Sequence, residues 1–168
     1  MDNKTALRVR AKSIRKNLDI TSLSNTAVQK IRELAPYKAA KNVLIFYPLK
    51  YEINVLELLK DDKNFYLPKV FEDKLLVCPY CDKLEKSYLN IYEPCSEPIN
   101  PKIIDLVIVP GLMVDKKNYR LGYGGGFYDR FLVSNPQIVS VLPISKDLIV
   151  ENLPIEEFDI PINYVISC

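Results

Sequence analysis

Histidine is absent from this sequence of 168 residues. Its absence excludes Ser-His-Asp and Cys-His catalysis, together with metal sites that use imidazole ligands. Any chemistry must therefore rely on carboxylates, lysine, arginine, tyrosine, cysteine, backbone amides or a bound metal. Cysteine is also scarce: the four cysteines are too few and too unevenly spaced for a disulfide framework, and we expect them to be reduced.

Glycine is both rare and confined to one stretch of the chain. Average usage of about 7% would give roughly 12 glycines, but the sequence has five, all of them between Gly111 and Gly126. The turns elsewhere use proline, which occurs 12 times. Because glycine is needed where the backbone takes a positive φ or where a Cβ would obstruct, we expect a ligand to bind at this stretch.

Long apolar runs and a strong net charge are lacking as well. The longest apolar run, residues 103–114, is interrupted by Asp105 and Pro110 and is much shorter than the roughly 20 residues of a membrane span. The first residues contain no apolar block of signal-peptide length. A net charge of +2 gives no overall field for a nucleic-acid backbone. We expect a cytoplasmic protein without a membrane or nucleic-acid partner.

Short apolar segments alternate with helical patterns along the chain. A helix over residues 3–18 is predicted by an apolar stripe at Leu7, Ala11, Ile14 and Leu18, and further helices are expected at 24–34, 53–59 and 127–133. Strands are expected at 42–47, 64–67, 74–78, 105–109, 138–142 and 164–166, and a proline-rich loop at 93–101. This order predicts an α/β fold: one domain over residues 1–168, a three-layer α/β/α arrangement with a mainly parallel sheet.

The first predicted helix also carries an ordered set of basic residues. At 3.6 residues per turn, about a quarter of the helix circumference contains Lys4, Arg8, Lys12 and Arg15. This basic stripe lies beside the apolar stripe. The pattern is more typical of a solvated charged face, and it also fits a helix that points cations into a neighbouring cleft.

The glycines lie in the segment VIVPGLMVDKKNYRLGYGGGFYDRFL, residues 107–132, which predicts a strand, a long loop and a helix. A helix N-terminus preceded by glycines presents free N–H groups and a positive dipole end, which favour an anion such as phosphate. Nearby are Arg120, expected to be an exposed loop cation, and Arg130, and both have guanidinium groups suited to phosphate. Asp115 and Asp129 offer carboxylates suited to Mg²⁺.

Two familiar phosphate templates do not fit this segment. A Walker A loop needs Lys and then Ser or Thr after its last glycine, and a dinucleotide fingerprint needs glycine where Phe127 stands. A phosphate ligand and a purely structural glycine turn therefore both remain open.

The run RLGYGGGFYDR, residues 120–130, resembles the signature loop of the 5-formyltetrahydrofolate cyclo-ligases, also called methenyltetrahydrofolate synthetases. The resemblance extends over nearly the whole chain. Lys4-x-x-Leu7-Arg8 with Arg15 is similar to the family's basic first helix, and Tyr47 with Glu52 is similar to its first strand and folate-contacting acid. Later matches in the family's order are 67–68, 91–94, 105–107, Asp115 and Asp159.

The resemblance implies an ATP-dependent and Mg²⁺-dependent reaction. ATP phosphorylates the formyl oxygen of 5-formyltetrahydrofolate, N10 attacks the activated carbon, and phosphate leaves to give 5,10-methenyltetrahydrofolate. Small molecules are then the partners, and we expect a monomer. The roles implied are ATP binding by Lys4, Arg8, Arg120, Leu121, Gly122, Tyr123, Gly124, Gly125, Gly126, Phe127 and Tyr128, catalysis by Arg120 and Tyr128, folate binding by Tyr47, Glu52 and residues 123–127, and Mg²⁺ binding by Asp129 and Asp159.

The chain also departs from the family's pattern. Asn118 stands in the loop where many members have glycine, although asparagine also tolerates the left-handed conformation. Phe158 precedes the aspartate at 159 where members often have His or Asn. Leu148 falls near the position of a common Gln.

Alternatives of other classes remain open at this point. One is a phosphosugar isomerase or CoA-transferase-like enzyme on a related sheet. Another is an RNA-binding module that uses the basic helix and the 11 tyrosines. Cys78-Pro79-Tyr80-Cys81 could serve redox catalysis, but no helix is predicted after Cys81, and structural thiols are favoured. A zinc site with Cys95 and Cys168 lacks a second close cysteine pair.

Overall fold

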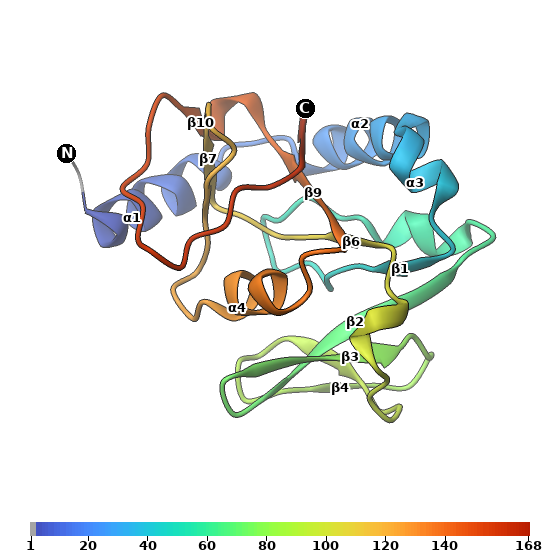
Figure 1. Cartoon of the computed structure of the whole chain (residues 1–168). Helices are drawn as coiled ribbons and strands as arrows, with labels where there is room; N and C mark the ends of the chain where they lie inside the picture. The colour runs from blue at the N-terminus through green and yellow to red at the C-terminus, as the bar shows by residue number, and fades with distance from the viewer. Residues whose placement is uncertain (1–2) are drawn as a thin grey trace.

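A six-stranded sheet in the order β11-β9-β6-β1-β2-β3 organises the computed structural model, which describes residues 3–168 (Figure 1). The strands are β1 (Asn42–Leu44), β2 (Asn64–Phe71), β3 (Lys74–Pro79), β6 (Leu106–Ile108), β9 (Val139–Ile144) and β11 (Tyr164–Ser167). Neighbouring strands run parallel except for β3, which pairs antiparallel with β2. The prediction of a mainly parallel sheet is confirmed.

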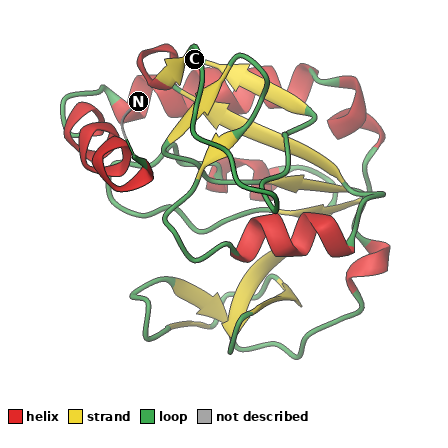
Figure 2. Cartoon of the chain, turned by 60° about the vertical axis from the view of Figure 1, so that its left-hand side comes forward, coloured by secondary structure: helices red, strands yellow, loops and turns green. Residues whose placement is uncertain are grey.

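Helices cover both faces of this sheet (Figure 2). On one face, α2 (Ile20–Glu33) and α3 (Ala35–Ala39) pack against Val43 and Ile45. On the other face, α1 (Lys4–Arg15) and α4 (Phe127–Ser134) share a core with Leu44. Since successive strand residues point to opposite faces, this alternation gives three layers, as the sequence predicts. No helix within residues 3–168 has the length and apolar character required to span a membrane.

Shorter elements surround the main sheet. Two small sheets contain β4 (Leu84–Lys86) with β5 (Tyr92–Pro94), and β10 (Ile149–Val150) with β7 (Met113–Asp115) and β8 (Arg120–Leu121). Three 3₁₀ helices are η1 (Leu56–Lys60), η2 (Pro101–Ile103) and η3 (Lys146–Leu148). Of these elements, β5 extends into the predicted loop at 93–101, and η2 begins at its last residue. Among the others, only η1 has a counterpart in the prediction.

Two of the predicted helices, at 24–34 and 53–59, differ from the structure in their start or type. The helix expected at 24–34 begins at Ile20, four residues early, because the Asp19 side chain accepts a hydrogen bond from Ser22 N (3.1 Å) and caps it. After its end, Pro36 starts the separate helix α3 rather than closing the helical region. The helix expected at 53–59 is the 3₁₀ helix η1, so β1 and β2 are joined without an α-helical crossover.

Two prolines lie inside strands that the prediction ended earlier. Pro68 pairs with Val77 in the long strand β2, and Pro143 pairs with Ile166 in β9. At both positions the strand on the other side has already ended, because β1 pairs with residues 64–66 and β6 with residues 139–141. Proline has no N–H to donate, so it is tolerated where only one side of a strand is paired. By contrast, the strand expected at 42–47 ends at Leu44.

The long loop expected before α4 is largely ordered by β7 and β8. The turn between them contains Asn118 with φ 67°, which confirms that asparagine adopts the left-handed conformation there. The Asp115 carboxylate accepts hydrogen bonds from Lys117 N (2.9 Å), Tyr119 N (3.0 Å) and Leu153 N (3.1 Å). Asp115 is therefore buried in a backbone network, and it does not offer a free carboxylate to a metal.

Candidate functional site

A cavity of about 390 Å³ opens between α1, the glycine loop and the β4–β5 region. Its wall contains every residue to which the family resemblance assigns a role: Lys4, Arg8, Tyr47, Glu52, Asp129, Asp159 and residues 120–128. Residues from both ends and from the middle of the chain thus meet at one place. The other wall residues are Phe46, Leu49, Pro68, Val70, Leu75, Leu89, Ile91, Glu93, Pro110 and Glu156.

The glycine loop, residues 122–126, connects β8 to α4 along one side of the cavity. Gly124 (φ 111°) and Gly126 (φ 68°) occupy conformations that L side chains rarely adopt, and Gly126 is the N-cap of α4. The first turn of this helix therefore carries backbone N–H groups at the cavity, as an anion site requires. A Cβ on Gly124 would lie 3.5 Å from the Arg8 guanidinium, which is an ordinary contact, so the positive φ and not a lack of space favours glycine there.

Arg120 is buried, with 8% of its surface exposed, which corrects the expectation of an exposed loop cation. Its Nη1 donates to the Pro110 carbonyl (2.9 Å), its Nη2 to Asp129 Oδ2 (3.3 Å), and its guanidinium lies 5.5 Å from the centre of the Tyr128 ring. The Nε atom is buried and has no hydrogen-bond partner. Gly122 is needed here, because a Cβ would approach Arg120 Nη1 to 2.8 Å.

Two cations of α1 reach the cavity. Arg8 Nε donates to the Gly122 carbonyl (2.9 Å), and Lys4 Nζ lies 2.6 Å from Asp159 Oδ2 and 3.2 Å from Glu156 Oε2. Burial lowers the pKa of Lys4, but the hydrogen bonds and charges of these carboxylates outweigh it and raise that pKa above its ordinary value. The basic stripe is therefore divided: Lys4 and Arg8 line the cavity, Lys12 is a solvated residue, and Arg15 is buried.

The two predicted metal ligands are both engaged with protein groups. Asp129 accepts hydrogen bonds from Arg120 and, at 3.4 Å, from Ile160 N. Asp159 accepts from Lys4 and from Glu156 N (2.8 Å). Within residues 3–168 there is no group of three or more carboxylate or cysteine side chains arranged to hold a metal ion.

A polar cluster on the cavity wall contains Glu52 and Tyr123, with Arg15 behind them. The Tyr123 hydroxyl donates to Glu52 Oε1 and accepts from Arg15 Nη1 (2.7 Å), while Glu52 Oε2 accepts from Leu49 N (2.6 Å). Burial, with the negative charge of Glu52, raises the pKa of Tyr123 well above its ordinary value. The same two causes raise the pKa of Tyr128. Both tyrosines are therefore neutral hydrogen-bond donors at physiological pH.

The remaining wall is apolar and aromatic. It is formed by Pro68, Val70 and Leu75 of the β2–β3 hairpin together with Leu89 and Ile91 of the β4–β5 connection. Tyr47 stands beside it, with its ring centre 5.0 Å from that of Tyr92. Within this wall Glu93 is buried and its Oε1 accepts from Val70 N (3.0 Å). The sequence analysis gave Glu93 no role, because a single glutamate in a strand has no local signal of burial.

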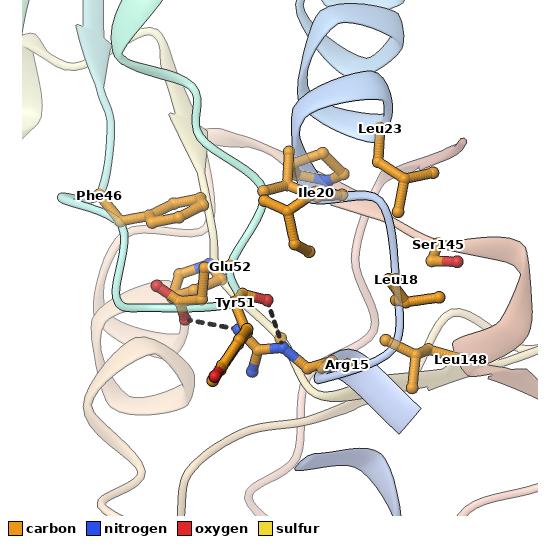
Figure 3. Close-up of a pocket in the computed structure, with 13 residues that line it drawn as sticks. Arg15, Leu18, Ile20, Leu23, Phe46, Tyr51, Glu52, Ser145 and Leu148 are labelled. Carbon is orange, nitrogen blue, oxygen red and sulfur yellow. Dashed lines mark hydrogen bonds and ion pairs between the residues drawn. The ribbon is translucent and has the colours of Figure 1, made fainter. Parts of the chain in front are cut away.

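A second and much smaller cavity, of about 20 Å³, lies behind Glu52 (Figure 3). Arg15, Leu18, Ser145 and Leu148 line it, and it shares Phe46, Glu52 and Pro110 with the large cavity. Leu148, which stands near the position of a Gln in the family, is buried in the lining of this small cavity and is not on the wall of the large one. Phe158 is exposed beside the cavity residue Asp159.

Other residues raised by the sequence lie outside the large cavity. Arg130 does not face it: Nε and Nη2 donate to the Asp73 carbonyl (3.0 and 2.8 Å), which ties α4 to the β2–β3 turn. The four cysteines are free thiols. No helix follows Cys81, and its thiol donates to the Lys83 carbonyl (3.2 Å), as expected for a structural thiol.

The chain matches the model of the 5-formyltetrahydrofolate cyclo-ligase family over residues 1–167. It is 31% identical to the 5-formyltetrahydrofolate cyclo-ligase of Haemophilus influenzae, over 93% of this chain and 92% of that protein. It is 27% identical to the protein of that name from Mus musculus, over 82% of this chain and 78% of the relative.

Solved structures agree with these sequence matches. The NMR structure of Aquifex aeolicus 5,10-methenyltetrahydrofolate synthetase has a TM-score of 0.84 at 30% identity, covering 98% of this chain and 89% of that one. The Mycoplasma pneumoniae 5,10-methenyltetrahydrofolate synthetase, at 24% identity and a TM-score of 0.79, shares the fold over 99% of this chain and 98% of its own. These matches favour the cyclo-ligase hypothesis over the isomerase and RNA-binding alternatives.

Proposed function

The chain belongs to the 5-formyltetrahydrofolate cyclo-ligase family, and from this premise we propose that it converts 5-formyltetrahydrofolate into 5,10-methenyltetrahydrofolate with cleavage of ATP to ADP and phosphate. The observation that carries the proposal is the division of one cavity into two chemically different ends. The glycine loop and the cations of α1 form an anion-binding end, and the β2–β3 and β4–β5 residues form an apolar end. ATP and a reduced folate have the matching properties.

ATP occupies the anion-binding end in this proposal. Residues 120–128 supply the loop and the first turn of α4, and Lys4 and Arg8 approach from α1. Backbone N–H groups at a helix N-terminus and nearby cations both stabilise phosphate oxygens. In this structure Lys4 is paired with Asp159 and Arg120 with Asp129. A bound phosphate group would replace these carboxylates as the partner of each cation, or would bind beside them.

The folate occupies the apolar end. Tyr47, Glu52 and residues 123–127 approach the ring system, and the apolar wall accommodates its less polar portion. Glu52 is an acceptor for the N–H groups that a pterin ring carries. Residues 123–127 belong to both ends, which would place the formyl group of the folate beside the terminal phosphate of ATP.

Chemistry at this junction needs no covalent enzyme intermediate. The formyl oxygen attacks the terminal phosphorus atom, and ADP leaves; N10 then attacks the activated carbon and loses its proton, and phosphate departs with the bonding electrons. Arg120 neutralises charge that develops on the transferring phosphoryl group, and the neutral Tyr128 hydroxyl is a hydrogen-bond donor there. Such reactions depend mainly on positioning and electrostatic stabilisation.

Mg²⁺ fits the oxygen donors at the anion-binding end. Mg²⁺ is commonly held by one or two carboxylates plus substrate phosphates and water, and Asp129 and Asp159 are the carboxylates available beside the glycine loop. Each oxygen of Asp129 has a single, long hydrogen bond (3.3 and 3.4 Å), so lone pairs remain free. The ion would neutralise phosphate charge when bound. We also propose that residues 1–168 act as one domain and as a cytoplasmic monomer on these small molecules, without nucleic acid.

The direct test is incubation of the protein with 5-formyltetrahydrofolate, ATP and Mg²⁺, with the absorbance of the methenyl product and the release of ADP followed together. We expect equal amounts of both products and no reaction when ATP or Mg²⁺ is omitted. Absence of the methenyl product under these conditions would contradict the proposal. RNA binding without turnover would support the RNA-binding alternative instead.

A further inference from the structure

Arg15 is a buried cation that lies just behind the ligand cavity. It has 6% of its surface exposed, and it lines the small cavity but not the large one. Burying a charge is unfavourable unless the group is paired and hydrogen-bonded. Its partners therefore indicate what it does.

Each nitrogen of the guanidinium faces a different oxygen. Nε donates to the Tyr51 carbonyl (2.9 Å), and Nη2 lies 3.8 Å from Glu52 Oε1 (Figure 3). Nη1 donates to the Tyr123 hydroxyl (2.7 Å). Tyr51 and Glu52 follow β1, whereas Tyr123 belongs to the glycine loop. One side chain of α1 thus joins the two segments that supply the polar cluster of the cavity wall.

The turn that carries Glu52 has an unfavourable backbone conformation. Tyr51 has φ 68°, in the left-handed region where a residue with a Cβ is disfavoured. The turn is closed by Glu52 N donating to the Leu49 carbonyl (3.0 Å) and by the Glu52 carboxylate accepting from Leu49 N (2.6 Å). The hydrogen bond from Arg15 to the Tyr51 carbonyl stabilises this turn from outside, so loss of Arg15 should let Glu52 move.

Arg15 also determines how the Tyr123 hydroxyl is oriented. Arginine has no acceptor, so the hydroxyl must accept from Nη1, and its own proton is then directed at Glu52. Arg15 forms the one ion pair that Glu52 makes within residues 3–168. The carboxylate is thereby fixed at the cavity wall by Arg15 and Tyr123 together.

We propose that Arg15 is a positioning residue for folate binding, which holds Glu52 and Tyr123 in place without touching the substrate. The inference rests on the proposed function, because it takes the Glu52 end of the cavity to be the folate end. Within residues 3–168 the polar partners of Arg15 are Tyr51, Tyr123 and Glu52, and of these only Tyr123 also belongs to the ATP end. Removal of Arg15 should therefore affect the two substrates unequally.

The test compares Arg15→Met, Arg15→Lys and the control Arg10→Met, which alters an exposed arginine of the same helix. KM is measured for each substrate at saturation of the other, and binding of 5-formyltetrahydrofolate alone is measured by calorimetry. In Arg15→Met we expect the folate KM and Kd to rise about tenfold or more, as for loss of hydrogen bonds to charged groups, with the ATP KM within about twofold. Arg15→Lys should recover part of the loss, and Arg10→Met should match the unsubstituted chain.

A double substitution separates positioning from a purely structural role. In a Glu52→Gln, Tyr123→Phe background, Arg15→Lys should raise the folate KM by less than about twofold, because the groups through which Arg15 acts are already lost. Equal increases of both KM values, or an undiminished effect in that background, would overturn the inference. So would unchanged folate affinity in both Arg15 variants.

The two proposals fail in different ways. If the unsubstituted chain binds 5-formyltetrahydrofolate but gives no methenyl product, the proposed reaction is wrong while the role of Arg15 in binding is still decided by calorimetry. If Arg15→Met does not fold, the KM values and the calorimetric Kd of Arg15→Lys decide whether Arg15 positions the folate site. A chain that does not bind 5-formyltetrahydrofolate at all would overturn both proposals.

Discussion

Arg120 combines burial with an incomplete set of hydrogen bonds. Pro110 and Asp129 fix the two terminal nitrogens, and the glycines at 111 and 122 leave room for the side chain. The unpartnered Nε is unusual, because buried polar atoms are nearly always hydrogen-bonded. In the proposed reaction, a cation held in this way is preorganised for the charge that develops on the transferring phosphoryl group.

Substitution of Arg120 should therefore affect both activity and folding. Because Arg120 is buried, Arg120→Ala should lower the melting temperature as well as turnover. Arg120→Lys keeps the charge but not the planar fork, and we expect it to reduce kcat about 100-fold with a smaller change in stability. Steady-state kinetics and thermal unfolding of both variants test this. Near-normal kcat in Arg120→Lys would contradict a role at the transferring phosphoryl group.

Asp129 lies next to Arg120 and has two conceivable roles, metal ligand and counter-ion. Asp129→Asn removes one charge at nearly constant volume, so the fold should persist. If Asp129 binds Mg²⁺, turnover falls about 100-fold and the Mg²⁺ concentration at half-maximal activity increases. Asp62→Asn, at an exposed carboxylate, is the control.

A Mg²⁺ titration of Asp129→Asn distinguishes the two roles. Reduced turnover with an unchanged Mg²⁺ midpoint would show that Asp129 acts through Arg120 and that its assignment as a metal ligand is wrong. Near-normal activity over the whole titration would exclude both roles.

At the scale of elements, α1 divides its basic residues between different surroundings. Lys4 and Arg8, four residues apart and hence on one face, line the cavity, whereas Lys12 is exposed. Lys4→Ala and Arg8→Ala should each raise the ATP KM about tenfold and change the folate KM less, because one phosphate contact is lost. Lys12→Ala is the matched control. Unchanged ATP kinetics in both variants would mean that the whole stripe is a solvated face.

The sequence predicts the position of helix α1 and its buried face, but it does not predict which groups its cations contact. Apolar spacing at Leu7 and Ala11 determines which face is buried, and it says nothing about what stands opposite the cations. The contact of Arg15 with Glu52 joins positions 37 residues apart, which no local pattern encodes. The glycine loop could be predicted from the sequence, because the positive φ at Gly124 and Gly126 favours glycine at those two positions.

The same reasoning explains the elements that the sequence did not reveal. β8 and β10 have two residues each, too few for any periodicity, and they exist because β7 lies between them. The predicted strands ended before Pro68 and Pro143, whereas the real strands continue through both prolines because each is paired on one side only. Long or strongly patterned elements, such as α1 and β3, were predicted correctly because their signals are local.

At the scale of the whole molecule, both ends of the chain build the cavity. Figure 1 shows the C-terminal segment before β11 running beside α1. Lys4 binds Asp159 and Glu156, Ile160 N donates to Asp129, and Leu153 N donates to Asp115. These contacts join residues 153–160 to α1, α4 and β7, so the anion-binding end is complete only when the whole chain is folded.

Stability also depends on charge far from the cavity, at a cluster of Arg32, Tyr37 and Asp61. Asp61 accepts hydrogen bonds from Arg32 Nε (3.0 Å) and from the Tyr37 hydroxyl (2.7 Å). Burial raises the pKa of Asp61, but these hydrogen bonds and the charge of Arg32 outweigh it and lower the pKa below its ordinary value of 3.8. A carboxyl whose pKa is lower in the folded state stabilises the fold above the unfolded pKa, and the contribution disappears as the pH falls through the folded value.

Asp61→Asn should therefore lower the free energy of unfolding by about 1–2 kcal/mol at pH 7, near the lower figure because solvent screens the partly exposed Arg32. The difference from the unsubstituted chain should be full above about pH 5 and should shrink as the pH falls below the ordinary carboxyl pKa of 3.8. Urea unfolding at a series of pH values measures it, with Asp62→Asn as the exposed neighbouring control. Turnover of the folded variant should be unchanged, because the cluster does not line the cavity. A stability difference that is the same at pH 7 and pH 3 would mean that the ionised carboxylate is not what stabilises this part of the fold.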